Sequence, residues 1–338
     1  MFNFKRKTKL LLTALPISFI LLTLLFTLSK TKSTTTKSHI HIHVHKNIQI
    51  AQTSCDGTLY PELCVSTLTN FPDLHTKTLT EIISANVNYT MSEVKDSTIN
   101  FTSLRKKLYK KIDPLDRQAL EDCLELLADT VLELKTALGD LSPNKSVDKQ
   151  YTDLQTLFSG AMTNQYTCLD GFAYSKKNVR KYFQKSLKKI SKHVSNSLAM
   201  LKKLKKQRQK NSSGHHSEIF SEYGEVKSGF PTWVKKKERA LLESTLNENK
   251  FDMVVAQDGS GNYSTINDAL RAAPNASSTR FVIHIKAGAY FEYIEIERTK
   301  SNIMLVGDGI GKTWIKGNRS VVDGWTTFRS ATVGEFSL

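Results

Sequence analysis

The chain is 338 residues long, which is room for about two domains of ordinary size. Its 39% apolar and 24% charged residues are normal for a globular protein and exclude a wholly disordered or fibrous chain. The net charge of +16 is local, because residues 176–210 hold fourteen Lys and Arg and no acid, whereas the other 34 basic and 32 acidic residues nearly balance. The chain therefore has one basic segment and not a basic fold.

The first 30 residues have the pattern of a segment that directs a protein into the secretory pathway. Four basic residues precede an apolar stretch from Leu10 to Leu28; they are Lys5, Arg6, Lys7 and Lys9. The stretch is nineteen residues long, close to the roughly 20 that span a bilayer, and no small-x-small cleavage site follows it. A cleaved signal peptide and an uncleaved signal anchor with its basic end in the cytoplasm both fit. Either would place the rest of the chain in an oxidising compartment.

Residues 31–47 are polar and rich in Thr, Lys and His, and we interpret them as a linker. Four histidines alternate between His39 and His45, so an extended chain would present them on one face, where a metal could bind. No Cys or carboxylate lies nearby to complete such a site. The sequence favours a solvated stalk over a metal site, and it predicts neither a metal nor another cofactor.

Four cysteines fit the same compartment as two disulfides; they are Cys55, Cys64, Cys123 and Cys168. Their spacing lacks the CxxC of a zinc site, and it leaves three pairings open. Seven Asn-x-Ser/Thr sequons are candidates for glycosylation in a secreted protein. They begin at Asn88, Asn100, Asn144, Asn211, Asn262, Asn275 and Asn318.

Residues 48–210 have a helical periodicity. Over 114–141 the apolar side chains recur every three or four residues, as expected for a helix with one buried stripe. Asp113 and Pro114 supply an N-cap and a proline in the first turn.

Three further stretches have helical length and pattern. A second apolar stripe runs from Leu169 to Leu204, and the less regular segments are 76–92 and 147–166. The simplest packing for these pieces is an all-α, antiparallel four-helix up-down bundle over residues 48–210.

The basic run over 176–210 belongs to the polar face and the tail of the last predicted helix. A secreted protein is a poor candidate for nucleic-acid binding, so we expect no nucleic-acid partner. A solvated face is the favoured interpretation, and contact with an acidic polysaccharide or an anionic membrane is the alternative.

Residues 211–249 read as a linker, and the periodicity then changes to that of short strands over 250–338. Phe281–Ile285 and Tyr293–Glu297 are short runs with the pattern of strands, and Gly-rich turns separate them. These patterns predict a β domain, and periodicity alone leaves a sandwich, a barrel or a β-helix open.

Two glycine clusters suggest phosphate loops but lack their requirements. The stretch Gly307–Thr313 ends in Gly-Lys-Thr, yet Val306 stands where a P-loop needs its first glycine, and another strand follows instead of a helix. Both this cluster and Asp258–Gly261 are interpreted as turns. His284 alternates within a strand and is interpreted as a structural or surface histidine, so the residues alone give no catalytic set.

The cysteine contexts resemble those of plant pectinesterase-inhibitor domains, a bundle that invertase inhibitors share. The similar segments are Cys55-Asp-Gly-Thr-Leu-Tyr-Pro-Glu-Leu-Cys64, Ala119-Leu-Glu-Asp-Cys123 and Thr167-Cys168-Leu-Asp-Gly-Phe172. The resemblance implies that Cys55 bonds to Cys64 and that Cys123 bonds to Cys168.

Four later blocks are similar to the beginning of plant pectin methylesterases. They are Val254–Ile266, Ile285–Glu292, Asn302–Gly309 and Asp323–Thr332, in the order that the family has. The resemblance implies the first coils of a right-handed parallel β-helix over residues 250–338. Such coils are stabilised by stacking, so we expect an isolated 250–338 fragment to be poorly stable.

The resemblance also carries expectations for individual sites. Members of the family often have a dibasic-Leu-Leu processing site for a subtilisin-like protease between the two domains, and Arg239-Ala240-Leu241-Leu242 keeps only one of its two bases. The family's catalytic aspartates and oxyanion glutamines lie beyond the last similar block, so no catalytic residue is assigned. Of the family's substrate contacts, only the threonine matching Thr327 is present.

Three functions follow as hypotheses. In the first, the bundle binds a pectin methylesterase and inhibits it, and the esterase part is inactive. In the second, the chain is an incomplete gene product of a pectinesterase that hydrolyses methyl esters of homogalacturonan pectin. In the third, it is a non-functional remnant. The expected location is the extracellular cell wall, or the Golgi or cell-surface membrane if the N-terminal segment is uncleaved.

Overall fold

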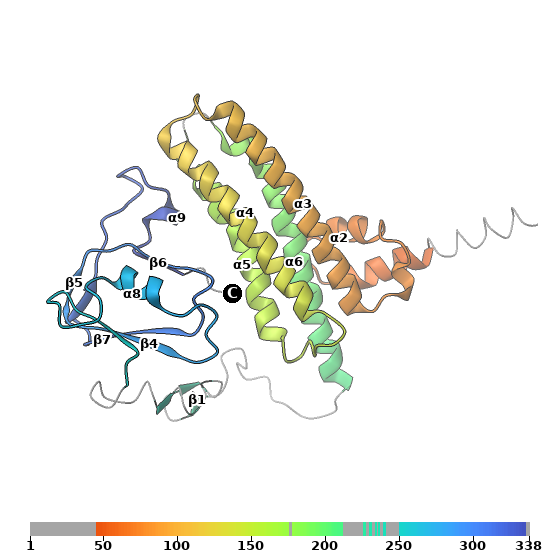
Figure 1. Cartoon of the computed structure of the whole chain (residues 1–338). Coiled ribbons are helices and arrows are strands. Elements are labelled where there is room, and N and C mark those ends of the chain that lie inside the picture. Colours follow the sequence, from red (N-terminus) through yellow and green to blue (C-terminus); the bar gives the residue numbers. More distant parts are fainter. Residues whose placement is uncertain are drawn as a thin grey trace, which may run out of the picture.

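The computed structural model describes residues 45–175, 178–211, 226–227, 230–231, 234, 236, 239–240 and 250–335. A helical bundle and a set of short parallel strands lie side by side, with the strands next to α4 and α5 (Figure 1). The predicted secretory segment lies outside the described residues, as do most of the two predicted linkers and all of the His39–His45 run except His45. In the described ranges, no helix is both long and apolar enough to cross a membrane.

Within the described residues, the bundle contains four long helices. These are α3 (Leu79–Leu108), α4 (Pro114–Asp140), α5 (Tyr151–Asp170) and α6 (Arg180–Asn211). Helices α3 and α5 each pack against both α4 and α6, so all four surround one core. A helix over residues 45–55, α2 (Pro61–Leu68) and the 3-10 helix η1 (Leu74–Thr76) precede them. The predicted helical bundle is confirmed, and it carries these shorter helices in addition to the long ones.

The starts of the helices follow from local chemistry. Helix α4 begins as predicted, because the Asp113 carboxylate accepts a hydrogen bond from the Asp116 N–H at 2.8 Å. Helix α3 begins with a capping box in which Thr78 and Glu81 each bind the other's backbone N–H, at 3.3 and 2.7 Å. It continues past the predicted end at 92, because Val94 and Phe101 extend its buried side.

The apolar stripe from Leu169 to Leu204, interpreted as one helix, belongs to two elements. Helix α5 ends at Asp170, a turn follows, and α6 starts at Arg180. Ser175 holds the connection, since its hydroxyl donates to Asp116 at 2.9 Å and accepts the Val179 N–H at 3.4 Å. The prediction of a single helix was wrong because side chains between the two helices are also buried in the core. Their spacing along the sequence continues the spacing of the apolar residues in the helices on either side.

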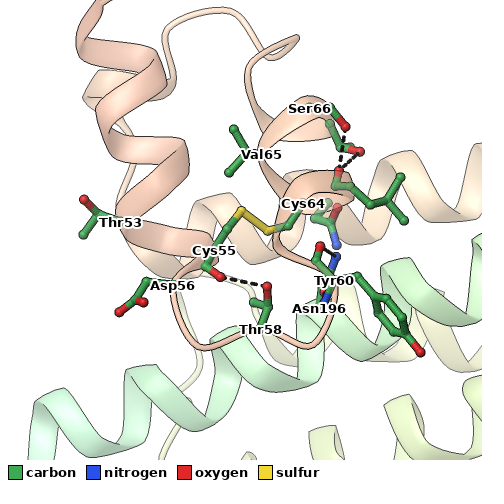
Figure 2. Close-up of a disulfide and its surroundings, with 12 residues drawn as sticks. Thr53, Cys55, Asp56, Thr58, Tyr60, Cys64, Val65, Ser66 and Asn196 are labelled. Atoms are coloured by element: carbon green, nitrogen blue, oxygen red, sulfur yellow. Dashed lines mark hydrogen bonds between the residues drawn. A yellow bond between two sulfur atoms is a disulfide. The ribbon is translucent and has the colours of Figure 1, made fainter.

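Two disulfides pin the bundle, in the pairing that the resemblance implied. Cys55–Cys64 closes the loop before α2, and Cys123–Cys168 joins α4 to α5. Figure 2 shows the first of these beside Asn196 of α6. The Asn196 amide donates to the Tyr60 carbonyl at 3.1 Å and accepts the Tyr60 N–H at 3.3 Å, so this loop is also tied to α6.

The second part consists of short parallel strands in stacked pairs. One sheet has the order β3 (Met253–Val255), β4 (Phe281–Ile285) and β7 (Ile303–Gly307). Strand β5 (Gly288–Tyr290) pairs with β8 (Thr313–Ile315), and β6 (Ile294–Ile296) pairs with β9 (Val333–Glu335). A separate antiparallel pair joins β1 (Val226–Lys227) to β2 (Phe230–Pro231). Because β4, β5 and β6 each pair with a strand of the next turn of chain, the arrangement fits part of a β-helix.

The motifs of this part have structural roles. The short helix α8 (Ile266–Ala272) covers the strands, and the Glu292 carboxylate accepts the N–H groups of its first two residues at 2.9 and 3.0 Å. The glycine-rich stretch before Thr313 leads into strand β8, so it is a turn and not a phosphate loop. His284 bonds to Asp308 at 2.7 Å and stacks on Phe251, as expected of a structural histidine.

Candidate functional site

Helix α4 carries four carboxylates along the side that faces the parallel strands. Asp122, Glu125, Asp129 and Glu133 follow one another at spacings of three and four residues, which places them on one face of a helix. We call these four residues the acidic face. Each of them lies in the neighbourhood of an arginine from the second part of the chain.

Arg329 is the first of these arginines and lies in helix α9 (Thr327–Ser330). Its Nε donates to Asp122 at 2.8 Å, and its Nη2 pairs with Glu125. The Asp122 side chain is only 4% exposed, so this ion pair is largely removed from solvent. A guanidinium group that binds two carboxylates in this way fixes both position and orientation.

The residues around Arg329 complete the contact. The Thr326 N–H donates to Gln118 at 3.0 Å, and the Thr326 hydroxyl donates to Asp122. The same Thr326 hydroxyl accepts the Arg329 N–H and thereby caps α9. Phe328 packs against the core of the bundle, so the contact has an apolar component beside its charges.

Arg298 forms the second half of the contact, further along α4. Its Nη2 pairs with Asp129 at 2.6 Å, and both side chains are mostly buried. Its Nη1 is buried without a hydrogen-bond partner among the described residues. Glu133 accepts a hydrogen bond from Asn164 of α5 at 3.0 Å, and the charge of Arg298 acts on it from nearby.

Burial dominates the electrostatics of the acidic face. It raises the pKa of Asp122, Glu125 and Asp129, even though Arg329 and Arg298 act in the opposite direction. It raises the pKa of Glu133 to about 7, with a smaller opposing effect of Arg298. Burial opposes the charge of Arg329 as well, but its bonds to Asp122 and the charge of Glu125 raise its pKa overall. Burial therefore disfavours the negative charge of the acidic face, and Arg329 and Arg298 offset part of this effect.

The disulfide between Cys123 and Cys168 lies directly beside Asp122 and fixes α4 against α5 at this point. Helix α9 contacts α5 as well as the acidic face of α4. The acidic face is therefore presented by a cross-linked helix pair, which limits the movement of its side chains.

The chemistry that this arrangement shows is the recognition of guanidinium groups. Carboxylates held on a rigid helix pair bind guanidinium groups in fixed positions. Among the described residues, no three His, Cys, Asp or Glu side chains gather as a metal would need.

The structure places the predicted site residues as follows. Thr327 is the first residue of α9 and is exposed, directly beside the residues that bind the acidic face. Arg239 donates to the Val234 carbonyl at 2.7 Å, Ala240 is exposed, and Leu241 and Leu242 lie outside the described residues. The roles of these residues in substrate binding and processing stay predictions.

The sequons occupy surface positions wherever their side chains are described. Asn88, Asn100, Asn144, Asn262, Asn275 and Asn318 are all exposed, and the Asn211 side chain lies outside the described part. Asn262 and Asn318 use their side-chain oxygens as acceptors, from the Val254 N–H and the Tyr293 hydroxyl, both at 2.8 Å.

The acidic face was not among the sites predicted from the sequence. Its spacing of three and four residues along α4 is visible in the sequence, but the same pattern is typical of a solvated helix face. Its partners, Arg298 and Arg329, lie more than 150 residues further along the chain.

Two family profiles match the chain. That of plant invertase/pectin methylesterase inhibitors matches residues 49–200, and that of pectinesterases matches residues 252–337. The first profile covers the bundle with its acidic face, and the second covers the strands with both arginines.

Curated relatives match across both parts. Probable pectinesterase/pectinesterase inhibitor 39 of Arabidopsis thaliana is 43% identical over 267 residues, which cover 77% of this chain and 48% of the relative. Pectinesterase/pectinesterase inhibitor U1 of Solanum lycopersicum is 39% identical over 298 residues, which cover 84% of this chain and 50% of the relative. The chain thus spans about half the length of the curated relatives it matches.

Solved structures match each part separately. Pectin methylesterase from carrot matches 28% of this chain and 30% of its own, at 47% identity and a TM-score of 0.25. A pectin methylesterase inhibitor from Arabidopsis thaliana matches 45% of this chain and 93% of its own, at 20% identity and a TM-score of 0.32.

Proposed function

The chain belongs to the plant pectinesterase/pectinesterase inhibitor family, and on this basis we propose that its helical bundle binds a pectin methylesterase and inhibits it. The bundle that we assign to this role is the predicted 48–210 domain, an up-down arrangement of its long helices. The partner surface is the first part of an esterase's right-handed parallel β-helix.

One observation carries this proposal. The acidic face of the inhibitor-type bundle holds Arg298 and Arg329, which both lie in the segment matching pectinesterases. A surface that binds a pectinesterase-type segment within one chain has the chemistry to bind the same kind of surface on another esterase. The mostly buried ion pairs and Phe328 make this contact more selective than exposed charges would.

The location that we propose is the extracellular cell wall, reached through the secretory pathway. The family's action on pectin supports this location, and the two disulfides fit an oxidising compartment. The membrane anchor and the processing protease remain proposals that rest on the sequence alone.

Hydrolysis of pectin methyl esters is the second candidate function, favoured by the pectinesterase match over 252–337. It predicts methanol release from pectin by the protein without any added enzyme. The two candidates are therefore separated by one assay run with and without an active esterase.

The test of inhibition is a titration of the oxidised chain into an active plant pectin methylesterase while methanol release is followed. A variant with Glu125→Gln and Asp129→Asn removes two charges from the acidic face. The control variant, Glu62→Gln with Asp96→Asn, removes two exposed charges elsewhere on the bundle. We expect inhibition by the wild type and the control, and inhibition weaker by about tenfold with the acidic-face variant. Equal inhibition by all three proteins would exclude the acidic face as the binding surface, and its complete absence would count against inhibition itself.

A further inference from the structure

A second surface of the bundle is a groove between α3 and α6, on helices that do not carry the acidic face. It has a volume of about 520 Å³, within the range of pockets that hold small ligands. Phe101 and Phe183 form an apolar floor, with their rings stacked at 3.6 Å, and the Tyr182 ring stands at the edge with 66% of the residue exposed.

The walls of the groove supply hydrogen-bonding groups and positive charge. Ser103, Ser186 and Asn100 line it, together with Lys107, Lys185 and Lys189. Lys189 is paired with Glu93 at 2.7 Å, and that glutamate is the one acid among the lining residues. Lys107 and Lys185 have no carboxylate partner in the part of the chain that the structure describes.

We propose that this groove binds a chain of acidic sugars, with Lys107 and Lys185 on a sugar carboxylate and Tyr182 against a sugar ring. An exposed aromatic ring offers an apolar surface to the C–H face of a sugar, and a polar handle at its edge. Two free ammonium groups beside hydroxyl and amide groups fit a carboxylate that is itself surrounded by hydroxyls. A neutral sugar would leave both ammonium groups without a counter-charge.

The positions of the lysines distinguish such a chain from an anionic membrane. A membrane surface attracts lysines by their number and not by their position, so the exposed Lys181 and Lys188 of α6 would contribute as much as Lys185. A sugar carboxylate held in the groove depends on the two lysines that line it. The experiment therefore has to show whether binding depends on the positions of the lysines or only on their number.

The test uses the whole chain, oxidised and produced without N-glycans, because Asn100 lies at the groove and carries a sequon. Calorimetry measures its binding to an oligogalacturonate of defined length, to the fully methyl-esterified form of that oligomer, and to phosphatidylserine vesicles. The groove variant is Lys107→Gln with Lys185→Gln. The matched control is Lys181→Gln with Lys188→Gln, which removes the same charge from exposed positions outside the groove.

We expect the wild-type chain to bind the oligogalacturonate and the groove variant to bind it about tenfold more weakly. The affinity of the control variant for the oligogalacturonate should stay within about threefold of that of the wild type. The substitution Tyr182→Ala should weaken binding even at high salt, where the interactions of exposed charges are screened. The methyl-esterified oligomer should bind less tightly than the acid. Equal losses in the groove and control variants, equal binding of the two oligomers, or binding to vesicles alone would each overturn the proposal. None of these results depends on esterase inhibition.

Discussion

At the scale of single residues, Glu133 makes the stability of the chain at the acidic face dependent on pH. Its pKa is raised to about 7, chiefly by burial, and burial also raises the pKa of Asp122, Glu125 and Asp129. A carboxyl group with a raised pKa binds its proton more tightly in the folded chain than in the unfolded chain. The stability that it contributes is therefore present at low pH and is lost as the pH rises from about 4.5 to about 7.

The substitution Glu133→Gln tests this assignment. Glutamine keeps an oxygen for Asn164 and has no charge to bury, so we expect the variant to be more stable than the wild type at pH 8, by about 1–2 kcal/mol. At pH 4.5 the two proteins should be nearly equal in stability. Urea unfolding at both pH values measures the difference, and a variant that is less stable than the wild type at pH 8 would contradict the assignment.

His193 has the opposite dependence on pH. It is fully buried beside Tyr89, neither ring nitrogen has a hydrogen-bond partner in the described part of the chain, and burial lowers its pKa to about 4. The folded chain therefore holds it neutral. Its contribution to stability is complete above about pH 6.5 and is lost as the pH falls toward 4.

We expect His193→Leu to remove this sensitivity to acid. Between pH 7 and pH 4 the wild type should lose about 2 kcal/mol more stability than the variant, as measured by urea unfolding at the two pH values. Parallel losses in the two proteins would show that His193 is not the group responsible.

At the scale of elements, the two disulfides should differ in what they contribute. In the chain-entropy model, a cross-link stabilises the fold more when it closes a longer loop. The sequence separation is 45 for Cys123–Cys168 and 9 for Cys55–Cys64.

Replacement of each cysteine pair by alanine should show this difference. We expect a loss of about 4 kcal/mol for the pair that joins α4 to α5, and of about 3 kcal/mol for the Cys55–Cys64 pair. Because Asp122 adjoins Cys123, the first replacement should also weaken inhibition of an esterase, whereas the second should not. Urea unfolding and the methanol assay measure the two effects, and the reverse order of stability losses would contradict the loop argument.

The elements also show how far the sequence alone could lead. The start of α4 was predictable because Asp113 and Pro114 act locally, and the apolar stripe over 114–141 reports one buried side. The break between α5 and α6 was not predictable from the pattern, because Phe172 and Val179, which lie between the two helices, are buried and continue the spacing of a helical stripe. Parallel strand pairing was likewise beyond periodicity, and only the resemblance pointed to it.

The candidate site could not be predicted from local sequence patterns. The carboxylates of α4 have the spacing of an ordinary solvated face, and what distinguishes them is burial under Arg298 and Arg329. That burial is a tertiary property of two segments far apart in the chain. The sequence could supply the family of each segment but not the contact between them.

At the scale of the whole molecule, the acidic face and its arginines belong to one chain. A tethered partner has a raised effective concentration, which depends on the length of the connection, so it competes with any esterase in solution. If the acidic face is the inhibitory surface, weakening the contact within the chain should make it more available to an external enzyme.

The most direct measurement is therefore the inhibition of an active plant pectin methylesterase by the Arg329→Gln chain, compared with the wild type and with Arg271→Gln. Arg271 lies in the same pectinesterase segment, is exposed, and pairs only with Asp268 among the described residues, so its replacement removes the same charge without touching α4. We predict that the Arg329→Gln chain reaches half-inhibition at a concentration about fivefold lower than the wild type, and that Arg271→Gln behaves as the wild type. Inhibition by Arg329→Gln that is equal to or weaker than that of the wild type would contradict the assignment of the acidic face as the esterase-binding surface.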